Sequence, residues 1–217
     1  MVDTMGDFVQ ALNAMLAEVL PPTLAGHALD AATIKTMVGK GSEHLVDLAL
    51  NTAFPNAGIG FSAIDRVALH AQALASYQRH YAAVNGLHAH TYPGVEDGLR
   101  GLLAAKLKLV CLTNKPLGFA RLLLQRKGLD RFFGAVFGGD SFERKKPDPL
   151  PLRKVCEFLG TAPARTLVIG DSSNDALAAR AAGCPVVLVT YGYNHGEPVR
   201  QVDADGFVDS LVALVPR

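Results

Sequence analysis

Two aspartates set four residues apart, Asp171 and Asp175, are the side chains of this chain whose spacing points most directly to chemistry. They follow the short apolar run 166–169 and a glycine. That run predicts a buried parallel strand, so Asp171 stands at the carboxyl end, where open α/β sheets bind ligands. Carboxylates placed there indicate a Mg²⁺ site, because Mg²⁺ takes oxygen ligands from one or two carboxylates and a substrate phosphate. The alternative is a helix-capping aspartate followed by a solvated one.

Thr113 and Asn114 stand in a similar place. They follow a second apolar run, 107–112, and precede a predicted helix over 117–126. A hydroxyl group and the free N–H groups of a helix start together form a cradle suited to phosphate. The alternative is that Thr113 or Asn114 only caps the helix.

Lys146 is the third candidate. It lies in a basic turn, 144–149, that Pro147 and Pro149 stiffen around Asp148. A lysine held in such a turn can direct its ammonium group at phosphate oxygens and carboxylates. The alternative is a solvated basic loop before a helix.

The elements that must position these residues alternate from about Tyr92 onward. Strands are predicted over 107–112, 135–137, 166–169 and 185–190, and helices over 94–106, 117–126, 150–159, 176–182 and near 210. Such alternation predicts an α/β fold with a doubly wound, Rossmann-like parallel sheet. Residues up to about 86 show helical spacing and no convincing strand. We therefore expect an inserted α-helical cap over 4–86 and an α/β core over 87–217, completed by residues 1–3.

The composition narrows the class of protein. The 217 residues are 49% hydrophobic, and 21 basic and 20 acidic residues give a net charge of +1, which argues against nucleic-acid or membrane-surface binding. No apolar run of about 18 residues occurs in the sequence, and we expect no secretory signal. The scattered cysteines, Cys111, Cys156 and Cys184, predict reduced and mostly buried thiols. We expect a cytoplasmic protein whose partner is a small molecule, with no nucleic acid and no membrane.

In their order along the chain, the threonine, the lysine before proline and the segment Gly-Asp-Ser-x-x-Asp resemble the second, third and fourth motifs of the haloacid dehalogenase superfamily of phosphatases. Other segments resemble bacterial phosphoglycolate phosphatases within it: 38–41, 91–95, 138–140 and 191–198. The resemblance covers essentially the whole chain. It implies a Mg²⁺-dependent hydrolase that cleaves 2-phosphoglycolate, or a similar small phosphorylated acid, through an aspartyl-phosphate intermediate.

The resemblance also implies a role for each candidate residue. Thr113, with Asn114, would bind the transferring phosphoryl group, and Lys146 would neutralise it. Asp171 would ligate Mg²⁺, while Asp175 would support the metal shell or orient Lys146.

Two further residues have alternative interpretations. Lys40, in the predicted cap, is a candidate contact for the carboxylate of the substrate, and the alternative is a solvated lysine. His195 is interpreted as structural or peripheral.

The first motif of the family, Asp-x-Asp-Gly-Thr at the end of the first strand, is not in this sequence, although Met1–Thr4 resembles its tail. The nucleophile and the acid/base aspartate are therefore expected ahead of Met1. The first, central strand is expected between the strands ending at Leu112 and Ile169, and it is missing too. Because losing a nucleophile cost on the order of 10⁶ in rate in a protease, we expect this chain to be inactive or nearly so.

Several interpretations stay open. The missing motif is explained by a misplaced start, a truncation or a pseudoenzyme. The substrate alternatives are a sugar phosphate or pyrophosphate, and the alternative from another class is a non-catalytic protein that binds phosphate or a metabolite.

Overall fold

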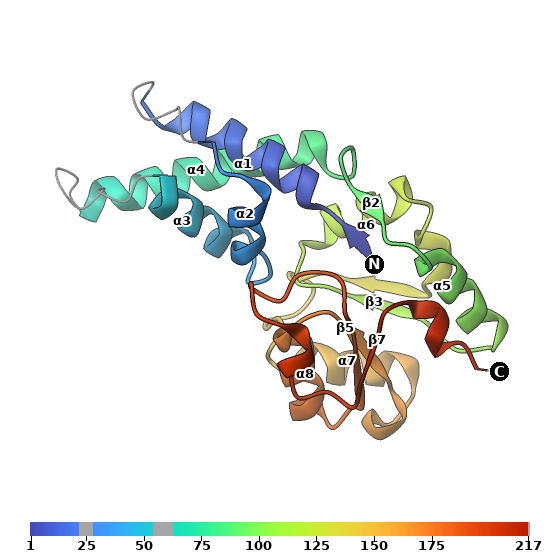
Figure 1. Cartoon of the computed structure of the whole chain (residues 1–217). Coiled ribbons are helices and arrows are strands. Elements are labelled where there is room, and N and C mark those ends of the chain that lie inside the picture. Colours follow the sequence, from blue (N-terminus) through green and yellow to red (C-terminus); the bar gives the residue numbers. More distant parts are fainter. Residues whose placement is uncertain (22–27, 54–62, 217) are drawn as a thin grey trace. The chain divides into compact units, whose positions relative to one another are not determined.

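The computed structural model describes residues 1–21, 28–53 and 63–216, and the chain forms two compact units. The core unit comprises Met1–Asp3 and His90–Arg217, and the helical unit comprises Thr4–Ala89. Figure 1 shows the elements of both. The predicted cap ended at residue 86, whereas the helical unit ends at Ala89.

The helical unit contains α1 (Met5–Val19), α2 (Ala31–Met37), α3 (Ser42–Ala53) and α4 (Ala63–Val84). Helix α1 packs most extensively along α4, and the rings of Phe8 and Tyr81 stack with centroids 5.5 Å apart. The carboxylate of Asp7, in α1, is fully buried and accepts hydrogen bonds from the backbone N–H groups of Gly86 (2.6 Å) and His88 (2.8 Å). This carboxylate ties the first helix to the segment that follows the last.

The core unit alternates helices with parallel strands. Its strands are β1 (Val2–Asp3), β2 (His90–Thr91), β3 (Val110–Leu112), β4 (Ala135–Phe137), β5 (Val168–Gly170), β6 (Val186–Val189) and β7 (Gly206–Val208). Its α-helices are α5 (Val95–Ala104), α6 (Leu117–Arg126), α7 (Leu150–Leu159) and α8 (Ser173–Ala182), and its 3₁₀ helices cover Asp130–Phe132, Pro163–Arg165, Val199–Gln201 and Leu211–Leu214.

The strands form three ladders. β3 pairs with β4, and β5 pairs with β6 and β6 with β7, all in parallel, whereas β1 pairs with β2 antiparallel. Within the residues described, β4 is the only strand paired with β3, and β6 the only one paired with β5. Across the described part of the chain, each of β3 and β5 therefore has one edge without a paired strand.

The predicted α/β fold with a parallel core is confirmed. The helices over 117–126 and 150–159 and the strand over 135–137 have the predicted bounds. Helix α8 starts at Ser173 rather than 176, because Ser172 and Asp175 form a capping box at its first turn. β1, β2 and β7 were missed, because runs of two or three residues carry no readable alternation.

Two bulk features accompany this fold. All three cysteines are buried free thiols, as predicted. Across the described part of the chain, no helix combines the length and apolarity needed to cross a bilayer.

Candidate functional site

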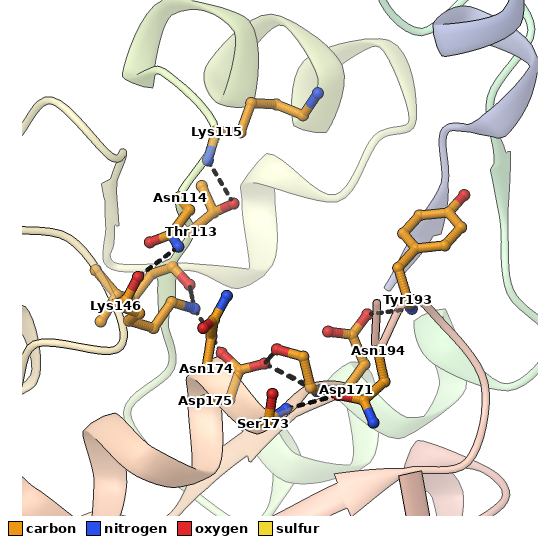
Figure 2. Close-up of polar contacts among 12 residues, drawn as sticks. Thr113, Asn114, Lys115, Lys146, Asp171, Ser173, Asn174, Asp175, Tyr193 and Asn194 are labelled. Atoms are coloured by element: carbon orange, nitrogen blue, oxygen red, sulfur yellow. Dashed lines mark hydrogen bonds and ion pairs between the residues drawn. The ribbon is translucent and has the colours of Figure 1, made fainter. Parts of the chain in front are cut away.

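Lys146 links the end of strand β3 to the first turn of helix α8 in the core unit. Its ammonium group donates to the backbone carbonyl of Leu112 at the end of β3 (3.0 Å) and to Oδ1 of Asp175 in α8 (2.7 Å), as Figure 2 shows. Its side chain is only 12% exposed, so it is not the solvated lysine of a basic loop. Burial alone would lower the pKa of Lys146, but the ion pair with Asp175 outweighs burial and raises it. The group is therefore a fixed positive charge.

Asp175 accepts hydrogen bonds both from Lys146 and from the residues at the start of α8. Its Oδ2 accepts from the backbone N–H groups of Asp171 (3.1 Å) and Ser172 (3.2 Å) and from the hydroxyl group of Ser172 (2.8 Å). Burial would raise the pKa of Asp175, but Lys146 and these donors hold it below its usual range. Because both oxygens accept hydrogen bonds from the protein, the geometry favours orientation of Lys146 over direct metal ligation.

Thr113 and Asn114 form the turn after β3. The Thr113 Oγ1 accepts from the N–H of Lys115 (3.1 Å), which leaves the hydroxyl proton for an acceptor outside the turn. The Asn114 amide donates to the carbonyl of Lys146 (2.8 Å), so it supports the lysine loop. The first N–H of α6, that of Leu117, instead donates to Asp140 (2.7 Å), so Asp140 takes the capping role considered for Thr113 and Asn114.

Asp171 stands directly after β5. Burial, and then the neighbouring Asp175 carboxylate, raise the pKa of Asp171 to about 6. Its Oδ2 accepts one long hydrogen bond from the N–H of Tyr193 (3.4 Å), and within the described residues its Oδ1 accepts none. A carboxylate with an oxygen not engaged by the protein suits a cation, which would favour the ionised form.

The donor set fits Mg²⁺ when a ligand completes it. In the described ranges no three His, Cys, Asp or Glu side chains lie together in a way that could hold a metal ion. A single carboxylate supplemented by phosphate oxygens and water is, however, an arrangement in which Mg²⁺ is commonly bound. Asp171 is the residue that would hold it.

The predicted site residues are thus divided between the units. Thr113, Asn114, Lys146, Asp171 and Asp175 all belong to the core unit. Lys40 belongs to the helical unit, where it is exposed in the turn between α2 and α3. Its part in substrate binding stays a prediction.

Sequence reasoning missed two residues that contact this site. Asn194 accepts a hydrogen bond from the N–H of Ser173 (2.8 Å), and Asn174, in the first turn of α8, pairs with His195 (3.2 Å). Asn174 lies between the two aspartates that drew attention to the segment. The contact of Asn194 joins residues 21 apart, and no local pattern signals it.

One Asp-x-Asp-Gly sequence does occur, at Asp203–Gly206. It precedes β7, whereas Asp171 follows the parallel strand β5. The Asp-x-Asp-Gly sequence therefore lies at the amino ends of these strands, and Asp171 lies at their carboxyl ends. Both its aspartates pair with Arg180, and Asp205 also accepts from the N–H of Val186 (2.7 Å). This sequence therefore holds α8 against the sheet and does not supply the first motif.

Comparison with known proteins gives the same family as the order of the three motifs. The model of the haloacid dehalogenase-like hydrolases matches residues 2–183. A phosphoglycolate phosphatase of Thiobacillus denitrificans is 42% identical over 97% of this chain and 88% of its own length. A plasmid phosphoglycolate phosphatase of Cupriavidus necator is 40% identical over 99% and 87%.

A solved structure agrees as well. That of a predicted phosphoglycolate phosphatase from Haemophilus somnus superimposes with a TM-score of 0.89, at 28% identity, over 99% of this chain and 91% of its own. The chain belongs to the haloacid dehalogenase-like hydrolases, the family that its three motifs predicted.

Proposed function

We propose that this protein is a Mg²⁺-dependent phosphoric monoester hydrolase whose substrate is 2-phosphoglycolate or a similar small phosphorylated acid. One observation carries the proposal: Lys146, from the segment between β4 and α7, holds a buried ammonium group against the carbonyl of Leu112, the residue before Thr113, and against the carboxylate of Asp175. The names of relatives that are 40% and 42% identical support the choice of substrate.

Each side chain has a defined task in this proposal. The ammonium group of Lys146 donates two hydrogen bonds within the described protein, so its third N–H can bind a phosphate oxygen. The Thr113 hydroxyl donates to a second oxygen. Bound Mg²⁺ supplies charge neutralisation for the transferring group. Asp175 keeps Lys146 protonated and in place.

The covalent step needs a carboxylate that these 217 residues do not supply. Family chemistry uses the aspartates of the first motif. The Asp203–Gly206 sequence lies at the amino ends of its strands, opposite to the carboxyl ends where Asp171 stands. We propose that the 217-residue chain binds phosphate but hydrolyses esters slowly or not at all. The edges of β3 and β5 that have no paired strand in the described residues support the expected place of the first strand.

A pair of proteins tests the proposal. One is the 217-residue chain, and the other is the same chain preceded by the first-motif segment of the Thiobacillus denitrificans relative. Phosphate release would be measured with Mg²⁺ from 2-phosphoglycolate, a sugar phosphate and pyrophosphate.

We expect the extended chain to release phosphate from 2-phosphoglycolate fastest and the shorter chain to remain at background. Equal rates above background from both chains would refute the account of the nucleophile. A preference for another ester by orders of magnitude would refute the substrate. Phosphate binding without turnover in both chains would favour a binding protein.

A further inference from the structure

The loop after β6, residues 191–198, lies against the first turn of α8 and against Asp171 (Figure 2). The sequence Tyr-Gly-Tyr-Asn-His-Gly-Glu-Pro contains no residue that the proposed function uses. Its contacts nevertheless converge on the residues that surround Asp171.

Asn194 makes the central contact. This residue is 8% exposed, and its Oδ1 accepts from the N–H of Ser173 (2.8 Å), one of the helix-start donors that no intrahelical carbonyl can reach. Its Nδ2 donates to the carbonyl of Glu197 (3.0 Å), and the N–H of Glu197 donates to the carbonyl of Asn194 (2.8 Å). One side chain therefore closes the loop and fixes it to α8.

Gly192 allows the loop to approach Asp171. Its φ is +111°, and a Cβ atom there would lie 2.2 Å from Oδ2 of Asp171. A side chain at this position would have to displace the carboxylate. The next residue, Tyr193, donates its N–H to the same oxygen (3.4 Å), so the backbone of the loop lies directly on one face of Asp171.

Two more contacts fix the residues on either side of Asn194. The hydroxyl group of Tyr193 donates to Asp3 in β1, and the ring of His195 pairs with the amide of Asn174 (3.2 Å). His195 has a φ of +54°, in the left-handed region that is uncommon for residues other than glycine.

We propose that residues 191–198 form a strap that positions Asp171 for Mg²⁺, with Asn194 as the positioning residue and Gly192 as the position that leaves room for the carboxylate. The inference rests on the proposed function, because it takes Asp171 as the metal ligand. Groups that orient a ligand without touching the ion commonly change metal affinity by about 10- to 100-fold when they are removed.

A purely structural role for Asn194 makes a different prediction, and Asn13 provides the matched control. Asn13, in the helical unit, makes the same two kinds of bond, accepting from the N–H of Leu29 (2.8 Å) and donating to its carbonyl (3.0 Å). Asn13→Ala and Asn194→Ala therefore remove equivalent hydrogen bonds, but only the second removes a contact beside Asp171.

The experiment has two readouts for the 217-residue chain and these variants: affinity for Mg²⁺ in the presence of saturating inorganic phosphate, by titration calorimetry, and hydrogen exchange at individual amides. In Asn194→Ala we expect faster exchange at Ser173 and Mg²⁺ binding weaker by about tenfold or more. In Asn13→Ala we expect faster exchange at Leu29 and unchanged Mg²⁺ affinity.

Glycine variants test the steric part of the proposal. Gly160 also has a positive φ, +66°, but a Cβ atom there would meet nothing within 4 Å. Gly160→Ala and Gly192→Ala therefore both place an alanine at a positive φ, whereas only Gly192→Ala displaces the carboxylate. We expect weakened Mg²⁺ binding in Gly192→Ala alone.

The outcomes separate this inference from the proposed function. Unchanged Mg²⁺ affinity in both Asn194→Ala and Gly192→Ala, with normal binding by the parent chain, would overturn the strap and leave the function standing. Unchanged exchange at Ser173 in Asn194→Ala would overturn it as well. Absence of Mg²⁺ binding in the parent chain would overturn the metal assignment and the strap together.

Discussion

Lys146 gives the site its charge at the scale of single residues. Its ammonium group and the Asp175 carboxylate lie 2.7 Å apart with side chains only 12% and 8% exposed. Removing one partner of such a pair leaves the other charge buried without compensation, which costs about 3–5 kcal/mol. The lysine is therefore needed for stability as well as for the phosphate binding that we propose.

The variant Lys146→Met tests both needs. We expect a loss of about 3 kcal/mol in unfolding free energy and loss of inorganic phosphate binding, measured by urea denaturation and by calorimetry. Lys154→Met is the control, because Lys154 pairs with Glu157 on the surface, where the side chains are 44% and 65% exposed. Such a surface pair contributes under about 1 kcal/mol. Similar losses in the two variants would contradict the buried-pair account.

The site residues could be predicted from their motifs in the sequence, but their hydrogen-bond partners could not. Thr113, Lys146 and Asp171 each follow or approach an apolar run in a recognisable motif. The acceptors and donors that fix them, such as the Leu112 carbonyl for Lys146, lie far away in sequence. Tertiary packing decides those contacts, and no periodicity encodes them.

The start of helix α6 is fixed by a residue from a different element. Its first N–H is satisfied by the Asp140 carboxylate from the turn after β4 (2.7 Å). Gly138 and Gly139 bring that turn close, since a Cβ atom at either position would lie 2.3 Å from the backbone of Leu117 or Asn114. The helix that follows Thr113 is therefore positioned by its neighbouring strand.

Asp140→Ala should lose this cap. We expect a decrease of about 0.5–2 kcal/mol in unfolding free energy, measured by urea denaturation. Asp140→Asn keeps an acceptor oxygen and should lose much less. An alanine variant as stable as the parent would show that Leu117 finds another acceptor.

Asp205 connects β6, β7 and α8 through a charge. The N–H of Val186 and the guanidinium group of Arg180 hold the pKa of Asp205 below its usual range. A lowered folded-state pKa adds stability above the unfolded value, about 3.9, and that stability is lost as the pH falls through the folded value.

Asp205→Asn should therefore be less stable than the parent at neutral pH, and the difference should shrink below about pH 4. Urea denaturation at a series of pH values measures it. Asp97→Asn, which makes the same exchange at a side chain that is 73% exposed, is the control for the substitution itself. A difference for Asp205→Asn that is constant with pH would contradict the linkage.

Helices and strands could be predicted from the sequence where they were long or had a clear apolar pattern. Helices α6 and α7 have their predicted bounds because apolar residues recur at helical spacing between Pro, Gly or charged ends. β7 was missed because three residues, Gly206–Val208, are fixed by pairing with β6 rather than by their own composition.

The whole molecule consists of two units that each bury their own apolar residues. In the helical unit Leu12, Met15, Ile34 and Val46 have no exposed surface, and Tyr77 and Tyr81 are each 2% exposed. The buried Asp7 carboxylate links α1 to the segment after α4. These features indicate a unit that can fold alone.

Residues 4–89 expressed alone should give a helical circular dichroism spectrum and a cooperative thermal transition. The same fragment carrying Asp7→Ala should melt at a lower temperature, because the N–H groups of Gly86 and His88 lose their acceptor. A disordered spectrum for the unmodified fragment would show that this unit depends on the core unit.

The short β1–β2 ladder has a consequence for how such chains diversify. Val2 is the register partner of Thr91 and Asp3 that of His90, so the core backbone leaves and returns at adjacent points. Doubling the length of an insertion between closed ends adds only about 0.6 kcal/mol of entropic cost. The helical unit can therefore be exchanged as a cassette, and evolution or a designer can vary it while the core-unit loops that carry Lys146 and Asp171 stay as they are.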